Sequence, residues 1–226
     1  MSGVITFVVV IAVVLAVAVF FSRQRTKNLT NVALQMGFKF EGKDWSDHKQ
    51  APHLETALFA ARGSKHFENI MSGASGNFRA SIFDFLIVEG RNRQVQTVAA
   101  FTQDKWFPTF SLQPKGLLQK MSEAIKHRDL KFDSNPGFSE HWQLRGADEQ
   151  RLRAVFTGTL LSYLEGLDPA KKWHIEGTSG TLILYRWNRK VKPADIRTFL
   201  DETSAVANNF FALADLRSSE HSAASV

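Results

Sequence analysis

The first 27 residues constrain this chain more than any other segment, because they contain a long and almost unbroken apolar run. From Val4 to Phe21 the only polar side chain is that of Thr6. At a helical rise of ~1.5 Å per residue this run covers about 27 Å, close to the thickness of the hydrocarbon core of a bilayer. A single segment within lipid satisfies its backbone hydrogen bonds only as a helix. The run therefore predicts a transmembrane helix.

A cleaved secretory signal is the main alternative, and Ala16-Val17-Ala18 offers a small-x-small cleavage pattern. Three features favour an anchor instead. No basic residue precedes the apolar run, the run exceeds the apolar part of an ordinary signal peptide, and it continues through Phe20 and Phe21. A buried helix of a soluble protein is a further alternative. We expect residues 1–27 to form a transmembrane anchor that ends in a basic stop.

The basic stop consists of Arg23, Arg25 and Lys27, which we interpret as the residues that determine topology. No charged side chain precedes the apolar run. The positive-inside rule then places the amino terminus outside and the carboxyl-terminal domain in the cytoplasm. Ala12 and Ala16 form a small-xxx-small pair through which two anchors would pack as a homodimer, although alanines that face lipid explain the same spacing.

Composition limits the classes of function. The net charge of +6 arises from 28 Lys and Arg against 22 Asp and Glu. No basic tract dominates, so we expect no nucleic-acid partner. The absence of cysteine excludes disulfides, thiolate metal sites and a cysteine nucleophile. It also fits a reducing compartment.

Residues 28–216 predict one soluble α+β domain. A helix at 29–36 ends at Gly37, and a short strand follows at 38–42, then a polar loop at 43–52. Four further segments have the residue pattern of strands in an antiparallel β-meander, and glycine turns separate them. They are 57–62, 66–74, 77–90 and 94–103. The third is apolar on both alternating faces, which indicates a central strand.

The second half changes to a helical period. Asp148 can cap a helix whose apolar positions continue from Leu152 to Leu167, and Pro193 opens another that continues to Ala214. Between them, 172–177 and 180–187 predict a hairpin. Amphipathic helices packed on a meander give an α+β fold. Two alternatives remain open: a single domain, or similar halves at 28–113 and 130–214. Residues 217–226 are small and polar and predict a disordered tail.

Few residues carry a catalytic signal. Asp84 lies between two phenylalanines, where burial would raise the pKa of its carboxyl and prepare it for proton transfer, but a hydrogen-bonded structural aspartate explains it better. Nucleotide-binding and nucleophile-elbow fingerprints are absent, so we expect no cofactor. The loop residues Asp44, Asp47, His48, His53 and Glu55 lack the spacing of metal ligands, and we predict no metal site.

Two patches have the composition of contact surfaces. In the stretch 185–193, Trp187 is surrounded by Arg186, Arg189, Lys190 and Lys192, which suit a membrane surface with anionic headgroups or a partner. A solvated turn between a strand and a helix is the plainer interpretation. In the stretch 105–114, Trp106 and Phe107 precede a proline that blocks ladder pairing, which would make an aromatic loop for a partner. Core-filling aromatics are its plainer interpretation.

The stretches MGFKFEG, SIFDF, FPTFSLQP and FDSNPGFSEHWQLRGADEQRLRAVF together resemble a family of uncharacterised bacterial proteins in which an apolar anchor precedes a domain of unknown function. The resemblance covers most of the chain after Lys27. It implies a location in the bacterial inner membrane and assigns no active-site residue.

Three functional hypotheses follow. The first is a single-pass membrane protein whose cytoplasmic domain binds a protein partner or the membrane surface without catalysis. The second is a membrane-tethered, hydrolase-like enzyme, for which Asp84 would lie in a cleft beside a histidine or a second carboxylate. The third is a small-ligand sensor with a closed apolar pocket inside the β region.

Overall fold

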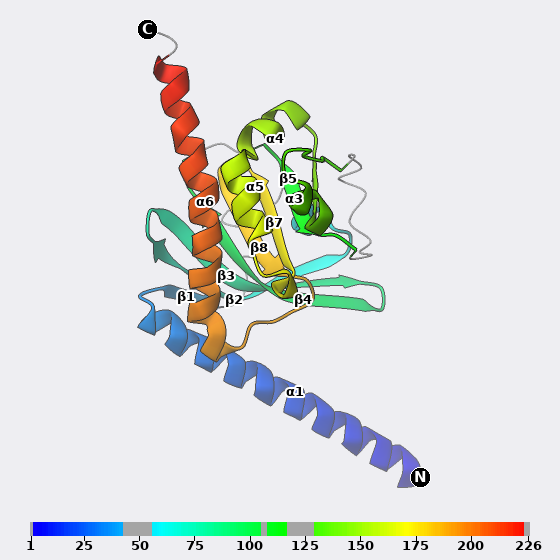
Figure 1. Cartoon of the computed structure of the whole chain (residues 1–226). Helices are drawn as coiled ribbons and strands as arrows, with labels where there is room; N and C mark the ends of the chain where they lie inside the picture. The colour runs from blue at the N-terminus through cyan, green and yellow to red at the C-terminus, as the bar shows by residue number, and fades with distance from the viewer. Residues whose placement is uncertain (1, 43–55, 105–107, 117–128, 224–226) are drawn as a thin grey trace.

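The computed structural model describes residues 2–42, 56–104, 108–116 and 129–223. It begins with one uninterrupted helix, α1 (Ser2–Gln35), which is long and apolar enough to cross a membrane. None of its most apolar window is buried in the folded body, unlike the core helix of a soluble protein. The helix predicted at 29–36 is the continuation of the anchor, so the expected boundary after Lys27 falls inside α1 (Figure 1).

The body of the protein is an eight-stranded antiparallel sheet, which confirms the α+β prediction. Its order is β1-β2-β3-β4-β8-β7-β5-β6. Strands β4 and β8 pair at the centre and join the two candidate halves in one sheet. The strands are β1 (Lys39–Gly42), β2 (Ser64–Ser75), β3 (Phe78–Glu89), β4 (Asn92–Thr102), β5 (Phe110–Pro114), β6 (Trp142–Gly146), β7 (Trp173–Thr178) and β8 (Thr181–Arg186).

Helices cover both faces of this sheet, and each face has its own hydrophobic core. On one face the second half of α1, α5 and α6 contribute Leu29, Leu164 and Phe210, in that order, to one core. On the other face the short α2 places Phe59 on Phe67 and Phe85, at ring-centroid distances of 5.8 and 4.9 Å. The helices are α2 (Ala57–Ala60), α3 (Pro136–His141), α4 (Glu149–Val155), α5 (Gly158–Glu165), η1 (Pro169–Lys171), η2 (Pro193–Asp195) and α6 (Ile196–Ala223).

Strand β3 shows why both faces are apolar. It lies between β2 and β4, as expected for a central strand. Because side chains alternate along a strand, Ile82 enters the core beneath α1 and α6 while Phe83 enters the core beneath α2. The hairpin turn at Ser179 and Gly180, the cap from Asp148 to Arg151 N, and the helix start at Pro193 are also confirmed.

Two local predictions are wrong. Residues 57–60 form helix α2 rather than a strand, because the Glu176 carboxylate accepts a hydrogen bond from Leu58 N at 2.9 Å and so stabilises the helix start. The helix expected through Leu167 is broken into α4 and α5 at Thr157, whose ψ of 168° is extended. Thr157 and Gly158 are both weak helix formers.

In the stretch 105–114, the sequence favours core-filling aromatics over an aromatic loop for a partner. Strand β5 begins two residues after Pro108 and lies between β6 and β7, with Phe110 and Leu112 in the core. Trp106 and Phe107 lie outside the described residues, as does the loop 43–52. At the other end of the chain, α6 continues to Ala223, through residues expected to be disordered.

Candidate functional site

Asp84, in the middle of β3, is a buried carboxylate that accepts several side-chain hydrogen bonds. It faces α1, and only 2% of its side chain is exposed. In the sheet it lies between Glu68 of β2 and Thr97 of β4. An ionised carboxylate at such a position requires compensating charge and hydrogen bonds, because burial alone disfavours the charged form.

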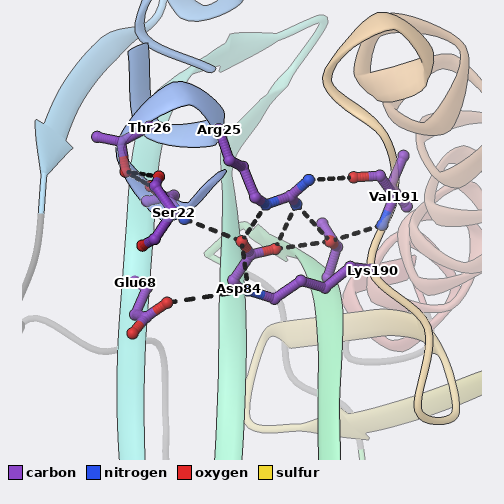
Figure 2. Close-up of polar contacts among 9 residues, drawn as sticks. Ser22, Arg25, Thr26, Glu68, Asp84, Lys190 and Val191 are labelled. Carbon is purple, nitrogen blue, oxygen red and sulfur yellow. Dashed lines mark hydrogen bonds and ion pairs between the residues drawn. The ribbon is translucent and has the colours of Figure 1, made fainter. Parts of the chain in front are cut away.

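Arg25 of α1 supplies that charge (Figure 2). Its Nε donates to Asp84 Oδ2 and its Nη2 to Oδ1, both at 2.8 Å, so the guanidinium and the carboxylate meet in a two-bond fork. Its Nη1 donates to the backbone oxygen of Val191, also at 2.8 Å. One arginine therefore joins α1 to the central strand and to the connection between β8 and α6. We call this arrangement the Arg25–Asp84 clamp.

Neighbouring groups fill the remaining acceptor positions of Asp84. Thr97 Oγ1 donates to Oδ1 at 2.8 Å, and Asn69 Nδ2 donates to Oδ2 at 2.9 Å. Lys190 Nζ lies 3.5 Å from Oδ2. Asn69 reaches this point from an irregularity in β2 with a φ of 54°, and it accepts a hydrogen bond from Thr26 of α1 at 2.8 Å.

The pKa of Asp84 follows from this arrangement. Burial by itself raises the pKa, but hydrogen bonding and charge from Arg25, together with Lys190 and Thr97, lower it below the ordinary value. The sequence suggested that burial would raise the pKa of Asp84 and prepare it for proton transfer, whereas the structure lowers this pKa. The signal that was missed is Arg25, whose partner lies 59 residues further along the chain.

The clamp lies at the point where the apolar part of α1 ends. Arg25 is only four residues beyond Phe21, and Leu29 and Ala33 of the same helix are buried in the core. Of the three topology residues, Arg25 is thus part of the folded domain. Arg23 and Lys27 are exposed and form no ion pair within the described chain.

The predicted basic patch at 185–193 divides into bound and exposed cations. Arg186 binds Glu202 at 2.8 Å, and its guanidinium lies over Trp173 at 4.3 Å. Lys190 faces Asp84, and Trp187 lies against the ring of His174 at 5.9 Å. Two cations of the patch are exposed and without an ion pair in the described part of the chain, Arg189 and Lys192.

Hydrogen bonds between backbone groups and to two side chains hold this connection against the edge of β4. Thr97 N donates to Arg189 O at 3.0 Å, and Val191 N donates to Thr97 Oγ1 at 2.9 Å. The side chain of Asn188 accepts from Val95 N at 3.1 Å. The stretch between β8 and η2 is therefore an ordered strap beside the clamp.

A second buried polar group lies on the opposite face of the sheet. Tyr185 Oη donates to Glu176 at 2.7 Å, and the Tyr185 ring stacks on His174 at 5.0 Å. Burial raises the pKa of Glu176 and lowers the pKa of His174 to about 4. His174 Nε2 has no hydrogen-bond partner in the described structure. This cluster connects α2 to the sheet.

A pocket of about 290 Å³ lies near the ends of β5 and β7, between α3 and η1. Trp142 and Trp173 form part of its wall beside Glu165 and Lys172. Among the described residues no group of three His, Asp or Glu side chains could hold a metal ion. The loop residues Asp44, Asp47, His48 and His53 lie outside the described ranges, as does Glu55.

No family model and no curated protein matches this chain. Among solved structures, the crystal structure of the mycobacterial trehalose monomycolate transport factor A, TtfA, is similar. The two share a TM-score of 0.61 and 15% sequence identity, over 84% of this chain and 94% of that chain. At this identity the similarity shows a common fold. That fold therefore occurs in a bacterial protein, which agrees with the coarser part of the resemblance seen in the sequence.

Proposed function

We propose that this chain is a single-pass membrane protein of the bacterial inner membrane. Its cytoplasmic domain would bind a partner without catalysis, in an orientation set by the anchor. The observation that carries this proposal is the Arg25–Asp84 clamp within a continuous α1. A flexible linker would be enough to keep a domain near a membrane. A rigid connection also fixes the direction in which the domain faces, which lowers the ordering cost of binding a partner from that direction.

The surroundings of Asp84 argue against the hydrolase-like alternative. That alternative needs Asp84 beside a histidine or a second carboxylate. A second carboxylate, that of Glu68, does lie opposite Asp84 on β2, but Lys190 Nζ lies between the two, 3.9 Å from Glu68 and 3.5 Å from Asp84. The hydrogen-bond partners of Asp84 are Arg25, Asn69 and Thr97, and its lowered pKa keeps it ionised. A carboxylate whose oxygens are already occupied by donors is poorly suited to accept a proton from a substrate.

The small-ligand sensor is also less well supported. A sensor of that kind needs a closed apolar cavity in the β region. The core beneath α2 is filled by aromatic rings, with Phe67 5.4 Å from Phe83 and 5.0 Å from Phe85. The pocket of about 290 Å³ lies at one end of the sheet, where charged and aromatic side chains alternate.

The similar mycobacterial structure is described as a transport factor. That description is compatible with a domain that serves a membrane process without catalysing a reaction. We carry over only this coarse role, as part of the proposal. The binding partner best suited to a domain with a fixed orientation is a protein that lies in or on the same membrane.

The proposal is tested by changing the rotation of the anchor about its helix axis relative to the domain. Alanines inserted between Phe21 and Ser22 leave the clamp intact while they rotate the anchor relative to the domain. Two alanines rotate it by about 200°, and four alanines by only about 40° with a shift of ~6 Å. Photo-crosslinking residues placed at exposed positions of the domain report the partner in intact cells.

We expect discrete protein adducts in the parent chain, their loss after the two-alanine insertion, and their retention after the four-alanine insertion. Adducts that survive both insertions unchanged would show that orientation is unimportant. A parent chain that forms no discrete adduct would contradict the binding role itself.

A further inference from the structure

The clamp determines which end of the sheet faces the bilayer. Thr26 of α1 contacts Asn69 of β2, and Phe38, just beyond the end of α1, lies against Gly73 further along the same strand. Helix α1 and strand β2 therefore run in the same direction. The start of β2, the end of β3 and the start of β4 consequently lie on the side of the apolar half of α1, where Figure 1 shows the β3–β4 hairpin extending.

The hairpin extends well beyond β8, and its turn extends beyond β2. Strand β2 begins opposite Val88, and β8 pairs with β4 only from Val98 onward. From Asp84 to the turn at Gly90, six residues of strand cover about 20 Å. From Arg25 back to Phe21, α1 covers only about 6 Å. If α1 stood perpendicular to the membrane plane and parallel to β3, the end of the hairpin would lie roughly 14 Å deeper in the bilayer than Phe21, where the apolar segment ends.

The hairpin end is too polar to enter hydrocarbon. Lys65, Arg91 and Arg93 are exposed there and form no ion pair within the described residues, and Glu89 is the acidic residue beside them. An arginine or lysine is costly to place within the hydrocarbon of a membrane, whereas near an anionic surface each cation is attracted to the headgroups. Both effects favour a tilt of α1 relative to the membrane normal, because a tilted α1 leaves the end of the hairpin in the headgroup layer.

We propose that the end of the β3–β4 hairpin is a second membrane contact, at which Lys65, Arg91 and Arg93 bind anionic lipid headgroups. With the clamp, this contact holds α1 tilted and the domain against the bilayer. The inference rests on the proposed function, because it requires α1 to span the membrane. It specifies which face of the domain lies on lipid and leaves the β1 edge and α6 open to a partner.

Two asparagines at opposite ends of the sheet provide a matched test. Asn92 is the first residue of β4, directly after the β3–β4 turn, Asn77 lies in the β2–β3 turn, and both are exposed. The chain contains no cysteine, so Asn92→Cys and Asn77→Cys each accept one fluorophore. The labelled full-length protein is reconstituted into phosphatidylglycerol vesicles that contain a lipid with a nitroxide on its headgroup.

We expect quenching at position 92 to exceed that at position 77 several-fold, and to fall to the level of position 77 after Lys65→Glu, Arg91→Glu and Arg93→Glu together. Lys39→Glu with Arg79→Glu, at the other end of the sheet, should leave it unchanged. Equal quenching at both positions would overturn the proposal, and so would full quenching in phosphatidylcholine vesicles, where headgroup charge is absent.

A failure of the hairpin contact can be distinguished from a failure of the proposed function. If the protein remains in the membrane and keeps its partner adducts while position 92 is unquenched, only the hairpin contact is wrong. A protein adduct formed from position 92 in cells, without quenching in vesicles, would assign this surface to an acidic partner instead. If the chain does not remain inserted in the vesicles, the anchor itself is wrong.

Discussion

Arg25 serves both membrane insertion and folding. It is one of the three cations that follow the apolar run, and it is also the partner of a buried carboxylate. Only 17% of its side chain is exposed. Because Asp84 sits in the central strand, a change at position 25 should affect the stability of the whole domain.

We expect Arg25→Met to lower the free energy of unfolding by about 3 kcal/mol, because it leaves a buried carboxylate compensated only in part by Lys190. Adding Asp84→Asn should restore more than half of the loss, since the uncompensated charge is removed. Denaturant unfolding of the full chain in mild detergent measures both. Arg23→Met, two residues earlier and exposed, is the control and should have little effect.

His174 should make stability depend on pH. Its pKa is about 4 in the folded protein, against 6.5 in its ordinary state. Between these values the unfolded chain binds a proton that the folded chain does not, so stability falls as the pH decreases from 6.5 to 4, by about 3 kcal/mol. His174→Phe, which can keep the stacking on Tyr185, should flatten this part of the profile. An unchanged slope in unfolding curves across this range would contradict the assignment.

Among the elements, α1 shows how one helix can belong to two environments. Its first half is exposed and apolar, and its second half buries Leu29 and Ala33 in the core. The helix is continuous because no proline or glycine interrupts it between Val4 and Gln35. The short α2 is the opposite case, since its position depends on Glu176 of a distant strand.

Two glycines provide an element-level test of the packing of β7. A Cβ at Gly177 would overlap the ring of Phe110 on β5, so Gly177→Ala should destabilise the protein by about 1–3 kcal/mol. A Cβ at Gly158, at the start of α5, meets nothing within 4 Å. Gly158→Ala should therefore be neutral or stabilising by up to about 1 kcal/mol, through helix propensity. Thermal unfolding of the two variants side by side compares them.

The positions of the basic residues predict the topology of the whole molecule in the membrane. Arg23 and Lys27 lie exposed on the domain side of the apolar run, so the amino terminus should be outside and the sheet in the cytoplasm. In intact cells with the outer barrier permeabilised, a membrane-impermeant maleimide should label Ser2→Cys and not Ser64→Cys. Labelling of Ser64→Cys and not of Ser2→Cys would show the reversed topology.

Local pattern was sufficient for most elements of the fold. The apolar run, the alternation along β3, the turn at Gly180 and the helical start at Pro193 depend on neighbours in sequence, so the sequence predicted them. The sequence did not indicate β5 as an internal strand, because its partners β6 and β7 come later in the chain. The break at Thr157 was also missed, since an apolar period continues through it.

The sequence by itself determined that this chain carries an apolar helix able to span a membrane, a basic stop behind it and an α+β domain, because each depends on composition or short-range periodicity. Only the tertiary structure decided which of the three cations pairs with Asp84 and which end of the sheet carries Lys65, Arg91 and Arg93 toward the apolar half of α1. These relations join residues far apart in the chain. They follow from the register of β2, β3 and β4, which sequence periodicity does not specify.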